Sequence, residues 1–582
     1  MRRTPVRPRR VAATGIVLAL LAAGCTGEEG PEVPSPRGAA STFVDAWNER
    51  AAGPIAGLID DDTPAPSPED LRRFFARTPG EGIGFEVELG DVELHASDSP
   101  EETPYPGEDS TATAAYSITY SAGDAAGEAL DGTIEMDFSF DTGWSFRWHE
   151  GAMWPGYPEA TGLRVERRWP RRASILDRKG RKLALGHAEA RRYPFGSAAG
   201  STVGHIGVLT REQADESDLY ERRDLAGVSG MELAFDERLA GTPGLRLQVV
   251  ERKRGLATIL RAPPVPGRPV KTTLDMRVQQ AAAAAYGATT GGAVVTDPSN
   301  GDLLAVVSSA ELNPENYVGA RDVQPFNRGL SGLYPPGSSL KVMTGAAALE
   351  TGVVDLDTRL TGPREYRGVR NFESGEFGSI DFPTALKFSV NTAFAQIAED
   401  LGAKRITRYA RAFGFNRPPE MALGAATPSF PRPEDEGDLM WGSIGQAQVL
   451  ATPLQMATIA GTIANGGRRM EPRISLHVKP SGERAVTKKT AATMTRLMED
   501  VVEGGTGVAA RIPGVRVAGK TGTAEVDVNG KRMNHAWFVA FAPADDPQLA
   551  VAVVSELGGI GGQVAAPLAR AILQATLPLA RP

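Results

Sequence analysis

The chain has 582 residues, of which 41% are hydrophobic and 23% charged, and this composition excludes a wholly disordered or fibrous protein. At about 150 residues per domain, the length predicts several domains rather than one compact core. The 71 acidic and 63 basic residues give a net charge of −8, which argues against nucleic acid as the main partner, and the single cysteine, Cys25, excludes intrachain disulfides and thiolate metal clusters.

The first residues predict an export signal. An arginine-rich leader precedes an apolar run of about 14 residues that ends at Gly24, which is short of the roughly 20 that a spanning helix needs, so residues 1–24 are expected to be cleaved. The small residues before Cys25 resemble a bacterial lipobox, although the aliphatic Leu21 stands one place earlier than usual. The resemblance implies that a lipid on Cys25 anchors the protein to the outer face of the cell membrane, with residues 25–38 as a linker. An ordinary signal peptide or a short anchor is the alternative.

Residues 39–156 predict a small α+β domain. An amphipathic helix begins at Ala39, with Phe43 and Trp47 one turn apart. Alternating residues predict strands, and acidic, proline-rich runs predict loops: strands at 113–120 and 132–140, loops at 60–70 and 97–110. The aromatic residues are interpreted as core, so no catalytic site is expected here.

Two further domains are predicted after this one. The first is assigned to residues 157–269, because a Pro/Gly-rich stretch follows at 263–269. The second, residues 270–582, has apolar runs near both of its ends and helical stretches between them, which predicts one sheet of about five antiparallel strands built from both ends. The expected strands are 293–297, 303–308, 515–528, 532–542 and 548–556, and the expected helices include 341–351, 384–401, 453–465, 488–502 and 564–575.

A possible nucleophile stands where the chain enters the first of these helices. Pro335-Pro336-Gly337 interrupts the chain before Ser338, so Ser338 is expected in the first helical turn, where free backbone N–H groups favour a developing oxyanion. Lys341, three residues later, lies on the same helical face and could remove the serine proton if its pKa is depressed. A Ser-x-x-Lys match alone is weak, because a chain of this length should contain roughly one or two by chance. On this match alone, a capping serine and a solvated lysine are the favoured interpretation.

Two more motifs change this interpretation. Ser389-Val390-Asn391 and Lys520-Thr521-Gly522-Thr523 follow in the chain order that serine penicillin-recognising enzymes share, and the chain resembles the class B penicillin-binding proteins over essentially its whole exported length. The resemblance implies a multidomain α+β fold: a nuclear-transport-factor-2-like domain at 39–156, similar to that of low-affinity members, a pedestal or dimerisation domain at 157–269, and a transpeptidase domain at 270–582 with a five-stranded antiparallel sheet flanked by helices.

The same resemblance implies roles for individual residues. Ser338 is the acylated nucleophile, Lys341 its base and Ser389 a proton relay on a turn between helices. Substrate-binding residues are Asn391, Lys520, Thr521, Gly522 and Thr523. The implied activity is a peptidoglycan D,D-transpeptidase that cross-links stem peptides and is acylated by β-lactams, without a cofactor and with other cell-wall synthesis proteins as partners. The alternatives are a D,D-carboxypeptidase, a serine β-lactamase and a non-catalytic β-lactam sensor.

Other motifs lead to weaker hypotheses. Gly514 to Thr521 also fits the Walker A pattern, but the following residues predict a strand and an Asn-Gly hairpin instead of the helix that a phosphate loop requires. The six histidines have no paired metal spacing, and no Gly-x-Ser-x-Gly elbow is present, so we expect neither zinc nor a Ser-His-Asp triad. His535 is interpreted as a satisfied core histidine, and the alternative is a group that supports the site from behind the terminal strands. The segment 505–510 mimics a dinucleotide fingerprint but is expected to be a loop.

Overall fold

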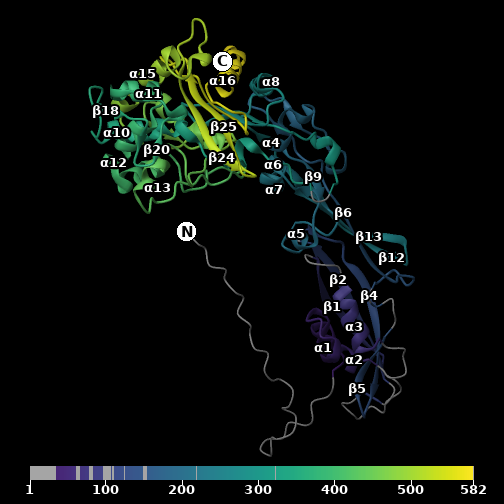
Figure 1. Cartoon of the computed structure of the whole chain (residues 1–582). Helices are drawn as coiled ribbons and strands as arrows, with labels where there is room; N and C mark the ends of the chain where they lie inside the picture. The colour runs from purple at the N-terminus through teal and green to yellow at the C-terminus, as the bar shows by residue number, and fades with distance from the viewer. Residues whose placement is uncertain are drawn as a thin grey trace, which may run out of the picture. The chain divides into compact units, whose positions relative to one another are not determined.

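The computed structural model describes residues 35–59, 66–77, 83–95, 106–107, 110–122, 125–148, 152, 154–217, 219–320 and 323–580. Cys25 and the predicted signal segment lie outside these residues. The chain divides into two compact units (Figure 1): the first comprises residues up to 167 together with 245–262, and the second comprises 168–244 together with the chain from 263 onward. Within the described ranges, no helix is both long and apolar enough to cross a membrane.

The first unit packs three helices on an antiparallel sheet. The helices are α1 (Pro36–Asn48), α2 (Ala52–Gly57) and α3 (Pro68–Arg77), and the strands are β1 (Ile83–His95), β2 (Thr111–Ala122), β3 (Ala125–Ala126), β4 (Leu130–Ser139) and β5 (Gly143–Arg147), in the order β1-β2-β4-β5 with β3 beside β2. Phe43 and Trp47 on α1 are buried, and the Phe43 ring stacks on Phe146 with centroids 4.3 Å apart. The aromatic residues therefore form core, as expected.

The first unit differs from the sequence expectation at helices α1 and α3. Helix α1 begins at Pro36 rather than Ala39, because Ser35 caps it and proline fits the first helical position. Helix α3 occupies part of the run 60–70 that was expected to be a loop. There Ser67 and Asp70 bond each other's backbone N–H groups reciprocally, at 3.2 and 3.1 Å, which starts a helix despite the proline-rich sequence.

A hairpin from later in the chain completes the first unit. Strands β12 (Gly244–Glu251) and β13 (Arg254–Ala262) form a three-stranded sheet with β6 (Gly162–Arg168), and Leu247, Val249 and Leu260 join the aromatic core. Packing therefore divides the segment 157–269 between two units, whereas the sequence pattern predicted one domain. The proline-rich stretch marks the return of the chain to the second unit.

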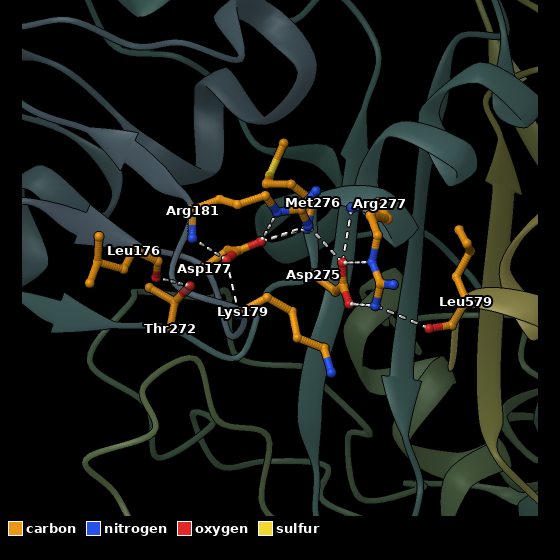
Figure 2. A network of polar contacts seen from close by, with 9 residues as sticks. All are labelled: Leu176, Asp177, Lys179, Arg181, Thr272, Asp275, Met276, Arg277 and Leu579. Carbon is orange, nitrogen blue, oxygen red and sulfur yellow. Dashed lines mark hydrogen bonds and ion pairs between the residues drawn. The ribbon is translucent and has the colours of Figure 1, made fainter. Parts of the chain in front are cut away.

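The remainder of this segment belongs to the second unit, where a buried polar network holds it (Figure 2). It carries β7 (Ile175–Leu176), β8 (Lys182–Ala184), β9 (Ile206–Val208), β10 (Leu225–Gly227), β11 (Gly241–Thr242) and the short helices α4 (Gly200–Val203), α5 (Arg211–Asp215), α6 (Gly230–Ala234) and α7 (Asp236–Ala240). The Arg181 guanidinium bridges two buried carboxylates, those of Asp177 at 2.7 Å and Asp275 at 2.8 Å. Arg277 binds Asp275 and reaches the carbonyl of Leu579, so the network joins three distant parts of the chain.

A five-stranded antiparallel sheet forms the centre of the second unit, as the sequence predicted. Its order is β17 (Asp302–Ser308), β16 (Gly291–Asp297), β26 (Leu549–Ser555), β25 (Lys531–Ala542) and β24 (Ala518–Val528), so strands from both ends of the unit pair directly. Helices α8 (Met276–Tyr286) and α16 (Ala565–Ala580) cover one face, and α14 (Pro453–Ala464) packs on the other. Strand β15 (Val270–Lys271) pairs with β7, and β14 (Val265–Pro266) pairs with β11.

The other helices of the second unit include the two that carry candidate site residues. These other helices are α9 (Arg328–Ser331), α10 (Lys341–Glu350), α11 (Phe382–Lys387), α12 (Asn391–Ala412), α13 (Glu436–Ser443) and α15 (Lys488–Gly504), with small strands β18 (Arg359–Gly362), β19 (Glu365–Tyr366), β20 (Val369–Arg370), β21 (Gly378–Asp381), β22 (Arg468–Met470) and β23 (Gly482–Arg484). The single helix predicted at 384–401 is wrong: Ser389 has φ +60° and separates α11 from α12. This turn agrees with the position that the family resemblance implied for Ser389.

Candidate active site

Ser338 and Lys341 stand at the entrance to a buried helix. Residues 337–340 form a 3-10 turn that runs directly into α10, so Ser338 precedes the α-helix instead of lying in its first turn. Gly337 has φ +54°, and a side-chain carbon there would lie 2.6 Å from the carbonyl oxygen of Thr523, so only glycine permits this approach. The turn thus fixes Ser338 against strand β24.

The Lys341 side chain links the first motif to the second. Its side chain is fully buried, and its Nζ donates to Asn391 Oδ1 at 2.6 Å, to the Ser389 carbonyl at 2.8 Å and to Ser389 Oγ at 3.3 Å. The Ser338 hydroxyl donates to the same Asn391 Oδ1 at 3.5 Å. The Asn391 amide is oriented by its own donation to the Arg370 carbonyl at 2.9 Å. Ser338 and Lys341 therefore share Asn391 Oδ1 as a hydrogen-bond acceptor.

The third motif reaches the same place from strand β24. Lys520 is fully buried, and its Nζ donates to Ser389 Oγ at 2.9 Å and to the Thr521 carbonyl at 3.0 Å. The Ser389 hydroxyl consequently lies between the amines of Lys341 and Lys520. Three segments separated by some 50 and 130 positions in the chain thus converge on one hydroxyl group.

Burial lowers the pKa of both lysine amines. Desolvation, followed by the charge of Lys520, holds the pKa of Lys341 well below its ordinary value. Desolvation lowers the pKa of Lys520 to about 7. The hydrogen bonds that these amines make to described residues go to hydroxyl, carbonyl and amide oxygens and to no carboxylate. One neutral amine and one nearby cation can therefore coexist at neutral pH, which suits a base beside an anion-binding group.

Close backbone packing completes the site around Gly522. A side-chain carbon at Gly522 would lie 2.6 Å from the Pro336 carbonyl, so glycine lets β24 press against the turn that carries Ser338. Thr523 Oγ1 accepts a hydrogen bond from the Gly561 N–H at 3.2 Å, and Gln446 Nε2 reaches the Thr523 carbonyl at 3.5 Å. The sequence-predicted residues 338, 341, 389, 391 and 520–523 are all brought together in this one region, with Cys25 outside the described residues.

Comparison with known proteins gives this site a family. Residues 291–574 match the penicillin-binding protein transpeptidase domain, and residues 183–272 match the penicillin-binding protein dimerisation domain. The peptidoglycan D,D-transpeptidase PbpA of Mycobacterium tuberculosis is 37% identical over 361 residues, which make up 53% of this chain and 73% of that protein. The chain belongs to the penicillin-binding protein transpeptidase family.

Further relatives agree with this membership. The peptidoglycan D,D-transpeptidase MrdA of Acinetobacter baumannii is 31% identical over 431 residues, so the chain spans 64% of the length of that relative. The penicillin G acyl-enzyme complex of penicillin-binding protein A from M. tuberculosis has a TM-score of 0.58 and 31% identity, with 70% of this chain and 99% of that chain covered. The two family domains matched here lie between residues 183 and 574, so the nuclear-transport-factor-2-like assignment of residues 39–156 stays a prediction.

Several residues at this candidate site were not assigned a role from the sequence. The Lys341 Nζ lies 5.1 Å from the centroid of the Phe394 ring. Phe394 follows Asn391 by one helical turn, and this spacing indicates in the sequence that the two side chains share a helix face. Arg370 contacts Asn391 through its backbone carbonyl, and Thr506 contacts Thr521 through its hydroxyl. No local pattern connects either residue to its contact.

Two of the weaker hypotheses are resolved by the fold of this penicillin-binding protein. Lys520 and Thr521 lie within β24, which continues to Val528, so the Walker A match does not open into a helix and is not a phosphate loop. His535 Nδ1 accepts the Leu557 N–H at 3.1 Å, and its ring packs against Tyr334 at 5.2 Å, in agreement with a satisfied structural histidine.

Proposed function

We propose that this protein is a peptidoglycan D,D-transpeptidase that works through an acyl-enzyme on Ser338. The observation that carries the proposal is the convergence of Ser338, Lys341 and Lys520 on the turn that bears Ser389 and Asn391. The family relatives named above are peptidoglycan D,D-transpeptidases, and a solved relative forms an acyl-enzyme with penicillin G. Both facts support the same chemistry for this chain.

In the acylation step, neutral Lys341 takes the Ser338 proton while the serine oxygen attacks the carbonyl carbon of the penultimate D-alanine. The lowered pKa of Lys341 supplies the neutral amine that this step needs. The backbone N–H groups of Ser338 and Thr523 are the proposed oxyanion hole, supported by the close approach of Gly337 to the Thr523 carbonyl. The C–N bond then breaks, and D-alanine leaves.

Departure of the amine requires a proton. Ser389 is the proposed donor, because its hydroxyl lies 2.9 Å from Lys520 Nζ and 3.3 Å from Lys341 Nζ and can be reprotonated from either. The terminal carboxylate of the donor peptide is proposed to bind Thr521, Thr523 and the charged form of Lys520, with Gly522 giving it room. Asn391 is proposed to hold the peptide amide. An amine of a neighbouring stem peptide then attacks the ester and forms the cross-link.

The location of the protein is a separate part of the proposal. We propose that residues 1–24 direct export, that Cys25 carries a lipid, and that residues 25–34 tether the folded units to the outer face of the cell membrane, with other cell-wall synthesis proteins as partners. Mass spectrometry of the mature N-terminus should find a diacylglyceryl group on Cys25. An unmodified N-terminus elsewhere in the chain, or a Cys25→Ser variant that stays on the membrane, would contradict the lipid anchor.

One paired assay tests the activity. Purified protein should be labelled by fluorescent penicillin at Ser338 and should cross-link a lipid-linked peptidoglycan polymer, and Ser338→Ala should abolish both reactions. Release of D-alanine without cross-links would indicate a carboxypeptidase, and rapid nitrocefin hydrolysis would indicate a β-lactamase. Labelling without any turnover would indicate a β-lactam sensor.

A further inference from the structure

The loop after α15, Gly505–Gly507, touches the candidate site but has no role in the mechanism above. Its backbone is held on one side by α11, because the Thr506 N–H donates to the Lys387 carbonyl at 3.2 Å. The Gly507 N–H donates to the Val501 carbonyl at 3.0 Å. The loop therefore contacts Lys387, two positions before Ser389 in the chain, and is anchored by main-chain bonds.

Gly505 and Gly562 allow close backbone packing around Thr506. A side-chain carbon at Gly505 would lie 2.4 Å from the Lys387 carbonyl oxygen, and one at Gly562 would lie 2.6 Å from the Thr506 carbonyl oxygen. Real side chains do not approach this closely, so neither position tolerates a larger residue without movement of the backbone. The fold thus fixes where the Thr506 hydroxyl lies.

That hydroxyl makes a short contact with the third motif. Thr506 Oγ1 lies 2.7 Å from Thr521 Oγ1, and Lys520 Nζ lies 3.4 Å from the same Thr521 oxygen. The two hydroxyls hold two protons and share one hydrogen bond, so one proton remains to donate elsewhere. If Thr506 donates to Thr521, the Thr521 proton is free, and the incoming bond makes it a stronger donor.

We propose that Thr506 is a positioning residue that directs the Thr521 proton toward the terminal carboxylate of the acyl donor. This inference rests on the proposed function and assigns a further residue to its carboxylate-binding group. Thr506 acts through Thr521 and touches no reacting atom. Its hydroxyl matters only for donors that end in a carboxylate, which separates this role from a purely structural one.

The test compares two donors on the purified full chain: an N-acyl-D-alanyl thioester of thioglycolate, which ends in a carboxylate, and its thioglycolamide counterpart. The wild type should prefer the carboxylate in kcat/KM. Thr506→Val should reduce this preference by about tenfold, the size expected for a weakened hydrogen bond to a charged group, mainly through a higher KM for the carboxylate donor. Thr506→Ser should restore the preference.

Matched controls make the result decisive. Thr495 on α15 donates its hydroxyl to the Ala491 carbonyl at 3.0 Å, and Thr495→Val should keep the wild-type preference. If Thr506→Val melts at a lower temperature than the wild type, Thr506→Ala serves as a second hydroxyl-free variant. An unchanged preference in these variants, or an equal loss with both donors, overturns the inference and leaves the proposed function intact. A wild type that reacts with neither donor and takes up no penicillin overturns both.

Discussion

Replacing Lys520 by methionine should make the protein more stable and inactive. The folded protein holds Lys520 fully buried with a pKa of about 7, whereas the unfolded chain protonates it near the ordinary value of 10.5. At pH 6.5 the folded state must therefore carry a buried charge, which costs about 5 kcal/mol at roughly 1.4 kcal/mol for each pH unit between the two values. Methionine fills a similar volume without this cost.

The gain is reduced by the hydrogen bonds that methionine cannot make. Lys520 Nζ donates to Ser389 Oγ and to the Thr521 carbonyl, and each lost bond costs about 1 kcal/mol, with a similar amount for the acceptors left buried. A net stabilisation of about 2 kcal/mol remains at pH 6.5, which should raise the melting temperature of the second unit by a few degrees. The advantage should shrink as pH rises above 7, reach zero between about pH 8 and pH 9, where the cost of the buried charge falls to the roughly 3 kcal/mol lost with the hydrogen bonds, and turn into a destabilisation by pH 10.

Differential scanning calorimetry of the full chain between pH 6 and pH 10, with penicillin labelling alongside, measures both effects. Lys387→Met is the matched control, because Lys387 is only partly buried, with its Nζ over the Phe388 ring, and should change neither the melting temperature nor its pH dependence. A Lys520→Met protein that melts below the wild type at pH 6.5, or whose stabilisation persists at pH 10, would refute the argument that burial of the lysine destabilises the fold.

Three further substitutions test other parts of the structure. Gly445→Ala should slow acylation by penicillin about a hundredfold, since the new carbon would lie 2.2 Å from the Gly337 carbonyl oxygen and displace the turn that carries the nucleophile. Glu311→Gln should stabilise the protein by about 3 kcal/mol at pH 8 and by almost nothing at pH 4.5. Burial raises the Glu311 pKa from 4.5 to about 7, so the cost of ionisation accumulates above pH 4.5 at roughly 1.4 kcal/mol for each pH unit, and denaturant titrations at both pH values measure it. Asp177→Asn should destabilise the fold by about 3 kcal/mol in the same titrations, because the buried carboxylate accepts bonds from Arg181 and from three backbone N–H groups.

The glycine and glutamate substitutions each have a counterpart that should be mild. Gly368→Ala places a carbon with nothing within 4 Å at a similar positive φ and should leave acylation unchanged. Glu315→Gln removes an exposed ion pair with Arg192 and should change stability by less than about 1 kcal/mol. Equal effects in a variant and its counterpart would contradict the packing or burial argument for that variant.

The sequence predicted the central sheet and the members of the site, because both depend on strong local patterns. The apolar runs at 293–297 and 549–555 were long enough to identify as strands, and the motifs at 338–341 and 520–523 were recognisable by spacing and order. The break at Ser389 was not visible in the residue pattern, since serine is tolerated in helices and its positive φ follows from tertiary contacts. The role of Thr506 depends on a contact between a loop and strand β24 that no periodicity encodes.

The return of β12 and β13 to the first unit gives the chain three covalent crossings between its two units, near residues 167, 244 and 262. A ribosome releases residues in order, so the first unit waits for Leu260 before its core can close, and by then residues 168–244 have also emerged. Cutting the gene after residue 156 would produce a fragment that lacks part of its own interior. A soluble fragment of the first unit should instead fuse residues 35–167 to 244–262 through a short artificial linker.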